Sequence, residues 1–270
     1  MELRLIVPAA PGWIGPTEEL AGSSWRILSD SIVSDEQRHT PYHCVSYSWG
    51  QETAPNLFGL PGQVSRNTRA ALNAAILASA SSTELSAFWI DAVCVPPGGA
   101  ARRATFESMG YIYSAAESVI VVLQSASYAI LTRNARSWEP YTEEDLRTLN
   151  EDRWIDSVWT YQELVNAKEL WFTTTGLEAG ISVSDEDLLN GIGLSLNRYK
   201  KKHEISAVEL RQRFPFLDAL EDRLTDRMIG GYLQRSVFAC LTDIGSRRCD
   251  PEMPENRLYT LLRAITQEPS

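Results

Sequence analysis

The chain has 270 residues, and because 44% of them are hydrophobic it can bury a full core as one large domain or two small ones. Its formal net charge of −10 argues against a nucleic-acid partner, since binding to a phosphate backbone needs a clustered basic surface. No run approaches the roughly 18 apolar residues of a membrane span, and the short, charged N-terminus does not resemble a signal peptide, so we expect a cytoplasmic protein.

Apolar segments with strand character alternate with helical patterns in the first half of the chain. Strands are expected at 3–7, 44–47, 87–93 and 119–123. A helix enters through Ser65 or Asn67, and apolar residues recur at helical spacing from Phe106 to Ala116. This alternation predicts an α/β fold in which helices cover both faces of a parallel sheet.

The second half of the chain is predicted to be more helical. A further strand is expected at 170–175, and helices are expected to begin near Thr142 and Ser184. The polar stretch 197–204 is typical of a connecting segment. We therefore divide the chain into an α/β domain at 1–180 and a helical extension at 181–270 that packs on it.

Polar and aromatic groups follow two of the predicted strands. Ser46, Tyr47, Ser48, Trp49 and Gly50 end one strand, and Asp91 ends the next. In open α/β sheets ligands bind at the carboxyl ends of strands, so these residues are candidates to line a small-molecule site, with the glycine allowing close backbone approach. The structural alternatives are an ordinary aromatic-glycine turn and an aspartate that caps the following loop.

A helix predicted around residue 160 brings an aromatic ring next to a carboxylate. Trp159 and Glu163 are four residues apart and therefore adjacent on a helix, where they could stack a ring and stabilise a positive charge. The alternative is that the tryptophan packs in the core and the glutamate caps a neighbouring backbone. In the helical projection, Asp156 and Asn166 share their face, while a separate core face holds Trp154, Val158, Tyr161 and Val165.

Other reactive side chains give weaker signals. Arg102, at a helix start, could meet phosphates, although a cation there is opposed by the helix dipole. Cys44 cannot pair with His43, because neighbours on a strand face opposite ways, and Cys94 has no nearby base. Four cysteines without Cys-x-x-Cys spacing and three scattered histidines form no metal-binding pattern. The P-loop, Gly-x-Ser-x-Gly and Gly-x-Gly-x-x-Gly motifs are absent.

Four motifs together resemble the ordered motifs of the fungal HET (heterokaryon incompatibility) domain. They read CVSYSWG at 44–50, FWIDAVCV at 88–95, MGYIYSAA at 109–116 and VWTYQEL at 158–164. The resemblance covers roughly residues 40–175, and the segment 247–262 resembles one that often follows in this family. The chain departs from the family at 95–98, where VPPG replaces an Ile-Asn-Gln-like turn, and in the run after it, where only Arg102 matches.

The resemblance implies a cell-death or non-self recognition effector with a flavodoxin-like fold similar to that of TIR domains. Several TIR domains cleave NAD with a helical glutamate, so it implies Glu163 as the catalytic residue. It also implies NAD or a related nucleotide as the ligand, no bound cofactor, and a homo-oligomer on activation. The expected ligand-binding residues are Tyr47, Ser48, Trp49, Gly50, Asp91, Arg102, Trp159 and Gln162.

Two other functions remain open at this stage. The chain could be a non-catalytic scaffold that assembles with its own kind, or a sensor that binds a nucleotide without turnover. A solvent-reachable Glu163 in a cleft with Tyr47, Trp49 and Asp91 favours the enzyme. A Glu163 that backbone hydrogen bonds seal favours the scaffold.

Overall fold

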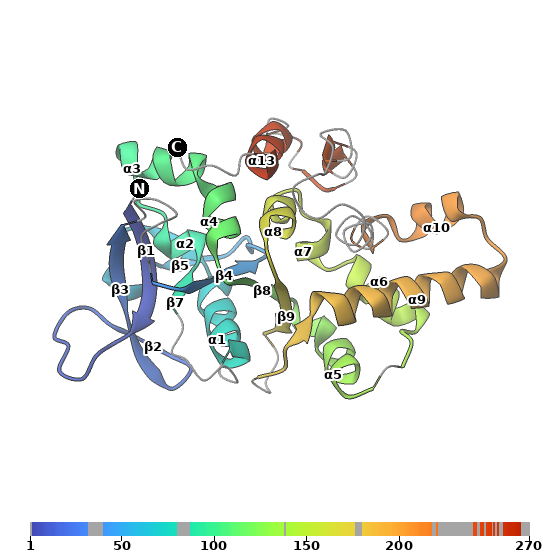
Figure 1. Cartoon of the computed structure of the whole chain (residues 1–270), viewed down its shortest axis with the longest axis horizontal. Helices are drawn as coiled ribbons and strands as arrows, with labels where there is room; N and C mark the ends of the chain where they lie inside the picture. The colour runs from blue at the N-terminus through green and yellow to red at the C-terminus, as the bar shows by residue number, and fades with distance from the viewer. Residues whose placement is uncertain are drawn as a thin grey trace.

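The computed structural model describes residues 2–31, 40–79, 87–137, 139–175, 180–217, 220, 240–241, 244–245, 247–249, 251, 253 and 256–265. Within these residues an eight-stranded sheet runs in the order β10-β9-β8-β4-β7-β1-β3-β2 (Figure 1). Its strands are β1 (Glu2–Pro8), β2 (Glu18–Leu20), β3 (Ser23–Ser31), β4 (Tyr42–Tyr47), β7 (Ala87–Trp89), β8 (Ser118–Leu123), β9 (Leu170–Thr174) and β10 (Val183–Ser184). A small second sheet pairs β5 (Thr53–Pro55) with β6 (Gln63–Ser65).

Helices connect the strands and form the C-terminal part of the described chain. They are α1 (Asn67–Ser79), α2 (Asp91–Cys94), α3 (Gly99–Glu107), α4 (Met109–Ala115), α5 (Tyr128–Arg136), α6 (Glu143–Asn150), α7 (Arg153–Asp156), α8 (Thr160–Asn166), α9 (Asp185–His203), α10 (Ala207–Arg213) and α13 (Asn256–Ile265). Two 3-10 turns lie at Leu57–Gly59 and Ser125–Ser127.

The predicted α/β class is confirmed, and the sheet is mixed. Its centre, β7-β4-β8-β9, is parallel, and numbering these strands along the chain gives the order 2-1-3-4 of flavodoxin-like sheets. Antiparallel strands flank this centre, because β3 pairs with β1 from Glu2↔Ser31 to Pro8↔Trp25 and β10 pairs with β9. Of the antiparallel strands, the sequence patterns predicted β1 alone.

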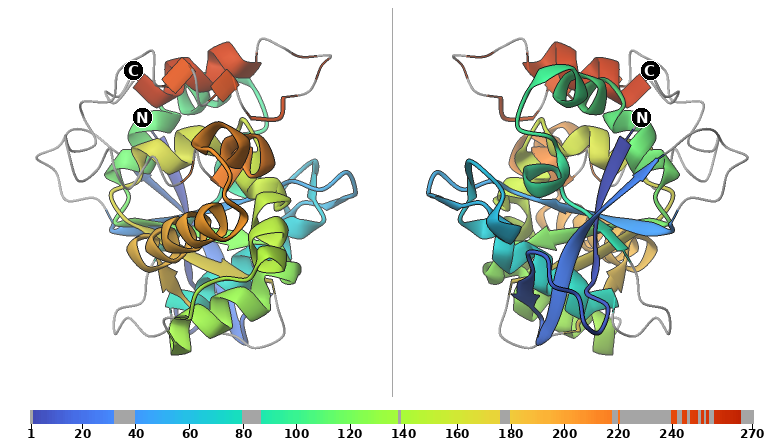
Figure 2. Two further views of the ribbon diagram at one scale, coloured as in Figure 1. Left: turned by 90° about the vertical axis from the view of Figure 1, so that its right-hand side faces the viewer. Right: turned by 90° about the vertical axis from the view of Figure 1, so that its left-hand side faces the viewer.

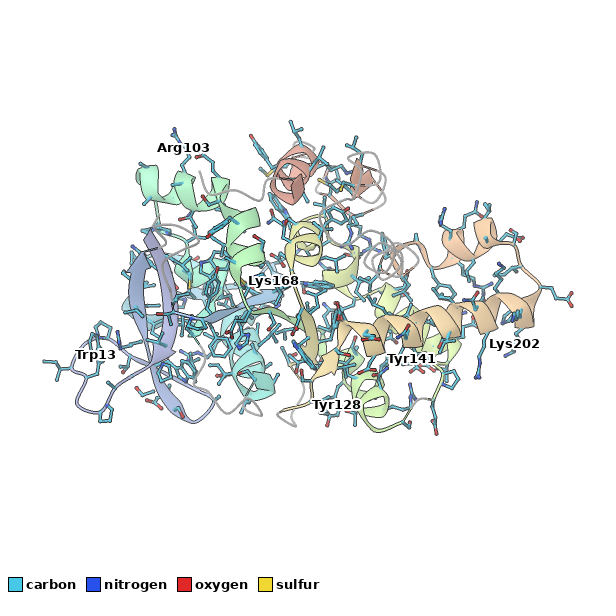
Figure 3. All side chains as sticks on the ribbon, in the orientation of Figure 1. Trp13, Arg103, Tyr128, Tyr141, Lys168 and Lys202 are labelled. Atoms are coloured by element: carbon cyan, nitrogen blue, oxygen red, sulfur yellow. The ribbon has the colours of Figure 1, made fainter. Side chains whose placement is uncertain are left out.

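Helices lie on both faces of the sheet. In Figure 1, α4 and α8 lie above the central strands and α1 and α5 below them, and Figure 2 shows α13 over the face that carries α4 and α8. Strand β4 faces both layers in alternation. Tyr42 and Cys44 donate hydrogen bonds to the Ile112 carbonyl in α4, whereas the Tyr47 hydroxyl lies against Thr68 in α1. Side chains fill the space between the layers (Figure 3).

The strand predicted at 87–93 is shorter than expected. It ends at Trp89, and Asp91 begins the single turn of α2. The Ile90 carbonyl accepts the N–H groups of Val93 and Cys94, while the Asp91 carboxylate accepts the N–H of Ala92. Asp91 therefore lies at the start of a helix directly after a buried strand, where an anionic side chain is favoured.

In place of the single helix expected around residue 160, the chain forms two helices, α7 and α8. α7 ends at Asp156 and α8 begins at Thr160, because the backbone of Arg248 pairs on both sides of Ser157 and holds it extended. The projection over 154–166 was therefore wrong. α8 is buried almost all round, since it packs against β4, α4 and α13.

The polar stretch 197–204 is not a connection. It continues α9 to His203, and Glu204 ends the helix with a left-handed φ of 53°. Basic residues occupy this last turn, where they complement the helix dipole, and Lys202 projects from the body in Figure 3. The boundary at residue 180 stays a prediction. No helix in the described part of the chain is long and apolar enough to cross a membrane.

Candidate functional site

The Glu163 carboxyl group lies in the interior between α8 and β4. Glu163 is 7% exposed, and the Tyr113 hydroxyl of α4 donates to its Oε1 at 2.8 Å. The Ser46 hydroxyl of β4 donates to its Oε2, and Ser46 in turn accepts the Trp154 indole N–H at 2.5 Å. Three side chains from three distant segments therefore enclose the carboxyl group, and the contacts that hold it are side-chain contacts.

The surroundings of Glu163 favour its neutral form. Burial and, to a smaller extent, the charge of Asp91 raise its pKa to about 8, although the hydrogen bonds from Ser46, Tyr113 and Trp154 act in the opposite direction. At neutral pH Glu163 is therefore mostly a protonated acid. A carboxyl group perturbed in this way is typical of functional sites, although structural networks produce the same effect.

Asp91 is the second carboxyl group of the cluster. Burial raises its pKa to about 6, although hydrogen bonds from the Ala92 N–H and the Trp49 side chain act in the opposite direction. Trp49 is 55% exposed, so the side chain that contacts Asp91 also reaches the solvent. At pH 7 Asp91 is mostly ionised and Glu163 mostly neutral, which divides the pair into a base and an acid.

The loop after β4 carries the other predicted residues of this region. Tyr47 points to the α1 side, where its hydroxyl lies 2.6 Å from Thr68 Oγ1. Burial raises its pKa, and the charges of Asp91 and Glu163 add to this effect. The Ser48 carbonyl accepts from the Asn67 side chain, and the Gly50 N–H donates to Ser65 Oγ at 3.1 Å. The loop is thus anchored to β6 and α1.

The remaining predicted residues lie around the cluster in different environments. Trp159 is 39% exposed at the start of α8, whereas Gln162 is 2% exposed, and its amide oxygen has no hydrogen-bond partner among the described residues. Arg102 donates to the Pro96 carbonyl at 3.3 Å and lies over the ring of Phe106. These contacts tie its guanidinium to its own loop and helix.

Three side chains enclose Glu163, and two of them, Tyr113 and Trp154, were not predicted as site residues. Ser46 gave a signal, because it is a polar residue at an inward position of an apolar strand, on the same side as Cys44. Tyr113 had only helical spacing, and Trp154 was assigned to the core. Each of the latter two is a large buried residue with a polar tip that needs a hydrogen-bond partner, so Tyr or Trp within a core pattern is the signal to look for.

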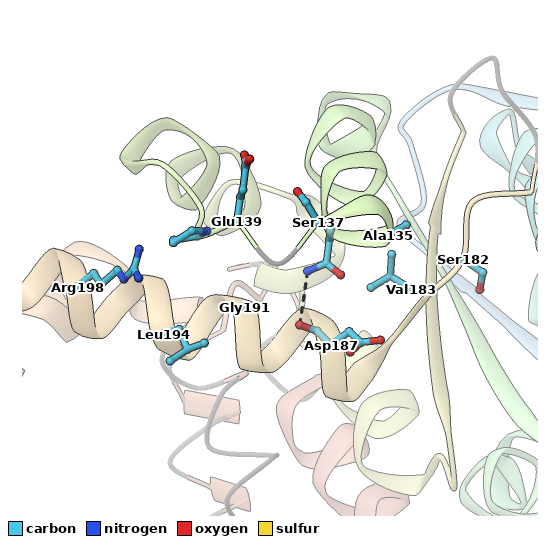
Figure 4. A pocket seen from close by; sticks show the side chains of 11 residues that line it. Ala135, Ser137, Glu139, Ser182, Val183, Asp187, Gly191, Leu194 and Arg198 are labelled. Atoms are coloured by element: carbon cyan, nitrogen blue, oxygen red, sulfur yellow. Dashed lines mark hydrogen bonds between the residues drawn. The ribbon is translucent and has the colours of Figure 1, made fainter.

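A separate cavity of about 280 Å³ lies between α5, β10 and α9 (Figure 4). A hydrogen bond from the Asn134 side chain to the Asp187 carbonyl crosses it. It shares no lining residue with the Glu163 cluster. The lining residues are Asn134, Ala135, Ser137, Glu139, Pro140, Ser182, Val183, Asp187, Gly191, Leu194 and Arg198.

Comparison with known proteins identifies the segment that contains the first half of the site. A family model described as heterokaryon incompatibility protein (HET) matches residues 42–150, which include β4, Asp91 and Tyr113 and end before Glu163. No curated protein and no solved structure gave a match. Residues 42–150 therefore match the heterokaryon incompatibility (HET) domain, and this match supports a role of the incompatibility and cell-death type.

Proposed function

We propose that the chain is a HET-type cell-death effector that hydrolyses NAD at the bond between nicotinamide and ribose, with Glu163 as its catalytic residue. The observation that carries the proposal is a pair of carboxyl groups with separated pKa values: Asp91 follows β7, and Glu163 of α8 contacts Ser46 of the neighbouring parallel strand β4. The likeness of HET motifs to TIR domains, several of which cleave NAD, supports it.

The chemistry follows from the charge that develops during cleavage. The bond from ribose C1′ to the nicotinamide nitrogen breaks, and its electron pair stays on the nitrogen. The ribose becomes an oxocarbenium-like cation, which an ionised Glu163 stabilises, as carboxylates do in glycoside hydrolysis. Water then adds to C1′ and loses its proton. The products are nicotinamide, ADP-ribose and a proton.

Substrate binding itself favours the ionised form of Glu163. The nicotinamide ring of NAD carries a positive charge, and a positive charge nearby lowers the pKa of a carboxyl group. Asp91 contributes negative potential from the start of α2, and Trp49 offers a ring for stacking. Trp159 offers a second exposed ring at the start of α8.

In this proposal the structure is a resting form. Both oxygens of Glu163 accept hydrogen bonds from the protein, so a substrate reaches it only after the Ser46 and Tyr113 contacts move. Clustering of several copies supplies a reason for such a movement, because contacts between protomers can favour an open state. The active form is then a homo-oligomer.

One observation favours a second function. Glu163 is enclosed and hydrogen-bonded by Ser46 and Tyr113, and a neutral acid in a satisfied buried network also fits a structural role. Under that alternative the domain is a non-catalytic scaffold for homotypic assembly. A nucleotide sensor without turnover would use the same end of the sheet.

The test is incubation of the purified chain with NAD, dilute and concentrated, while nicotinamide release is measured. Glu163→Gln keeps the shape of the side chain but cannot ionise, and Glu151→Gln, at an exposed position, is the matched control. We expect release by the wild-type and control proteins and none by Glu163→Gln. Release that survives in Glu163→Gln refutes the catalytic role. NAD binding without release supports the sensor, and assembly without binding supports the scaffold.

A further inference from the structure

Arg247 is a buried cation outside the segment that the family model matches. It is 2% exposed, and its Nη1 donates to the Ser157 carbonyl at 3.0 Å and to Thr160 Oγ1 at 3.2 Å. Its guanidinium carbon lies 5.3 Å from the centre of the Tyr161 ring. A buried charge needs such compensation, and Asp156 lies close enough for the two charges to interact.

The backbone beside Arg247 holds the same turn. The Arg248 N–H donates to the Asp156 carbonyl at 2.7 Å, and the Val158 N–H donates to the Arg248 carbonyl at 3.0 Å. The Arg247 carbonyl in turn accepts from Arg257 of α13 at 3.2 Å. A segment about 90 positions away therefore fixes the break between α7 and α8.

Two short paths lead from this turn to the Glu163 carboxyl group. Thr160, which accepts from Arg247, donates to the Trp154 carbonyl at 2.5 Å. The Trp154 indole then holds Ser46, which donates to Glu163. Thr160 is also the first residue of α8, one helical turn before Glu163, so its position sets where that side chain enters the core.

We propose that Arg247 is a positioning residue for Glu163. Its side chain fixes the first turn of α8, and through Thr160 and Trp154 it holds the carboxyl group against β4. The segment around Arg247 thus supports the site from outside, because it positions Glu163 without touching its carboxyl group. The consequence for NAD cleavage rests on the function proposed above, whereas the positioning itself can be measured on the carboxyl group.

The chemistry of the side chain makes the proposal specific to arginine. The guanidinium donates to two acceptors and stacks on Tyr161, and a lysine ammonium is a point charge that cannot do both in the same geometry. Arg248 is the matched control. It pairs with Asp156 from an exposed position at 3.1 Å, and its backbone contacts survive truncation of the side chain.

The experiment is a pH titration of the full chain labelled with ¹³C at the glutamate carboxyl groups, with the Glu163 signal assigned by its loss in Glu163→Gln. In Arg247→Lys we expect the pKa of Glu163 to fall by about one pH unit as water reaches it. Guanidinium ion should restore the wild-type value in Arg247→Ala. In Arg248→Ala the pKa should be unchanged. None of these arginine substitutions alters Asp91, Tyr47, Tyr113 or Cys44, the titratable groups that couple to Glu163.

Thr160→Val provides a second test that keeps Arg247 in place and removes the hydroxyl link to Trp154. It should also lower the pKa of Glu163. A wild-type pKa in folded Arg247→Lys, or in folded Thr160→Val if the lysine variant does not fold, overturns the proposal. If the wild-type chain cleaves NAD, the pH profile of kcat/KM in Arg247→Lys should move with the pKa. If the pKa moves but the wild type releases no nicotinamide, the positioning role holds and the NAD proposal fails.

Discussion

Replacing Glu163 by glutamine should make the fold more stable at neutral pH. The side chain is protonated in the folded state up to about pH 8, whereas an unfolded glutamate has a pKa near 4.5. The folded state therefore binds this proton more tightly than the unfolded state does. The stabilising effect of the bound proton is complete below about pH 4.5 and is lost as the pH rises to about 8. Glutamine has no such dependence. Its amide can accept from Tyr113 and donate to the Ser46 oxygen, which preserves the network.

The magnitude follows from the distance between the two pKa values. Each pH unit between them lowers the free energy of unfolding by about 1.4 kcal/mol, so the loss between pH 5.5 and 7.5 is about 3 kcal/mol. For a chain of this size that corresponds to roughly 6–12 °C in melting temperature. Asp91, whose pKa is about 6, makes the free energy of unfolding depend on pH mainly below that value. The interval from pH 6.5 to 7.5 therefore reports chiefly on Glu163.

The assay is urea unfolding of the wild type, Glu163→Gln and Glu151→Gln at pH 5.5, 6.5 and 7.5. The difference in unfolding free energy between Glu163→Gln and the wild type should grow with pH in favour of the variant. Glu151→Gln, at an exposed position, should follow the wild type. A difference that is the same at pH 5.5 and 7.5 would mean that Glu163 is ionised in the folded state, and the reasoning from burial would be refuted.

Two further substitutions test the packing around the cluster and around α9. Tyr113→Phe keeps the ring but removes the donor to Glu163 Oε1, so it should lower the free energy of unfolding by about 1–3 kcal/mol and raise the pKa of Glu163 further, as urea unfolding and carboxyl titration would measure. Gly191→Ala would bring a methyl group to 2.7 Å from the Tyr141 hydroxyl. The substitution should therefore lower the free energy of unfolding by about 1–3 kcal/mol, although alanine has a better helix propensity than glycine. The cost should shrink in a Tyr141→Phe background; an equal cost there would show that the hydroxyl is not the obstacle.

The parallel centre of the sheet was predictable because its strands are apolar throughout. The runs at 44–47, 119–123 and 170–175 match β4, β8 and β9 to within two residues. β3 was not predicted, because its nine residues include four serines and an aspartate. Its strand conformation comes from pairing with β1, a tertiary contact that local propensity does not report.

The break between α7 and α8 could not be predicted from local sequence. Residues 154–166 have helical spacing, and the extended conformation of Ser157 is imposed by Arg248 from far along the chain. The break changes the site. A continuous helix would place Trp154 on the core face with Val158 and Tyr161, away from the face of Glu163, whereas the turn brings its indole to Ser46, beside Glu163.

The state of Glu163 depends on contacts that the motif does not contain. The Trp-x-x-x-Glu spacing identified the residue, but Ser46 and Tyr113, which engage both of its oxygens, lie 117 and 50 positions away. Because a neutral, enclosed acid cannot stabilise a cation, catalysis at this position requires a second conformation that admits water or substrate and lowers the pKa of Glu163. An enclosed Glu163 is what a regulated effector needs in its inactive form, and it is also what a scaffold needs permanently. The two functions therefore differ in whether the enclosure opens, and a fall in the pKa of Glu163 when copies of the chain cluster would separate them.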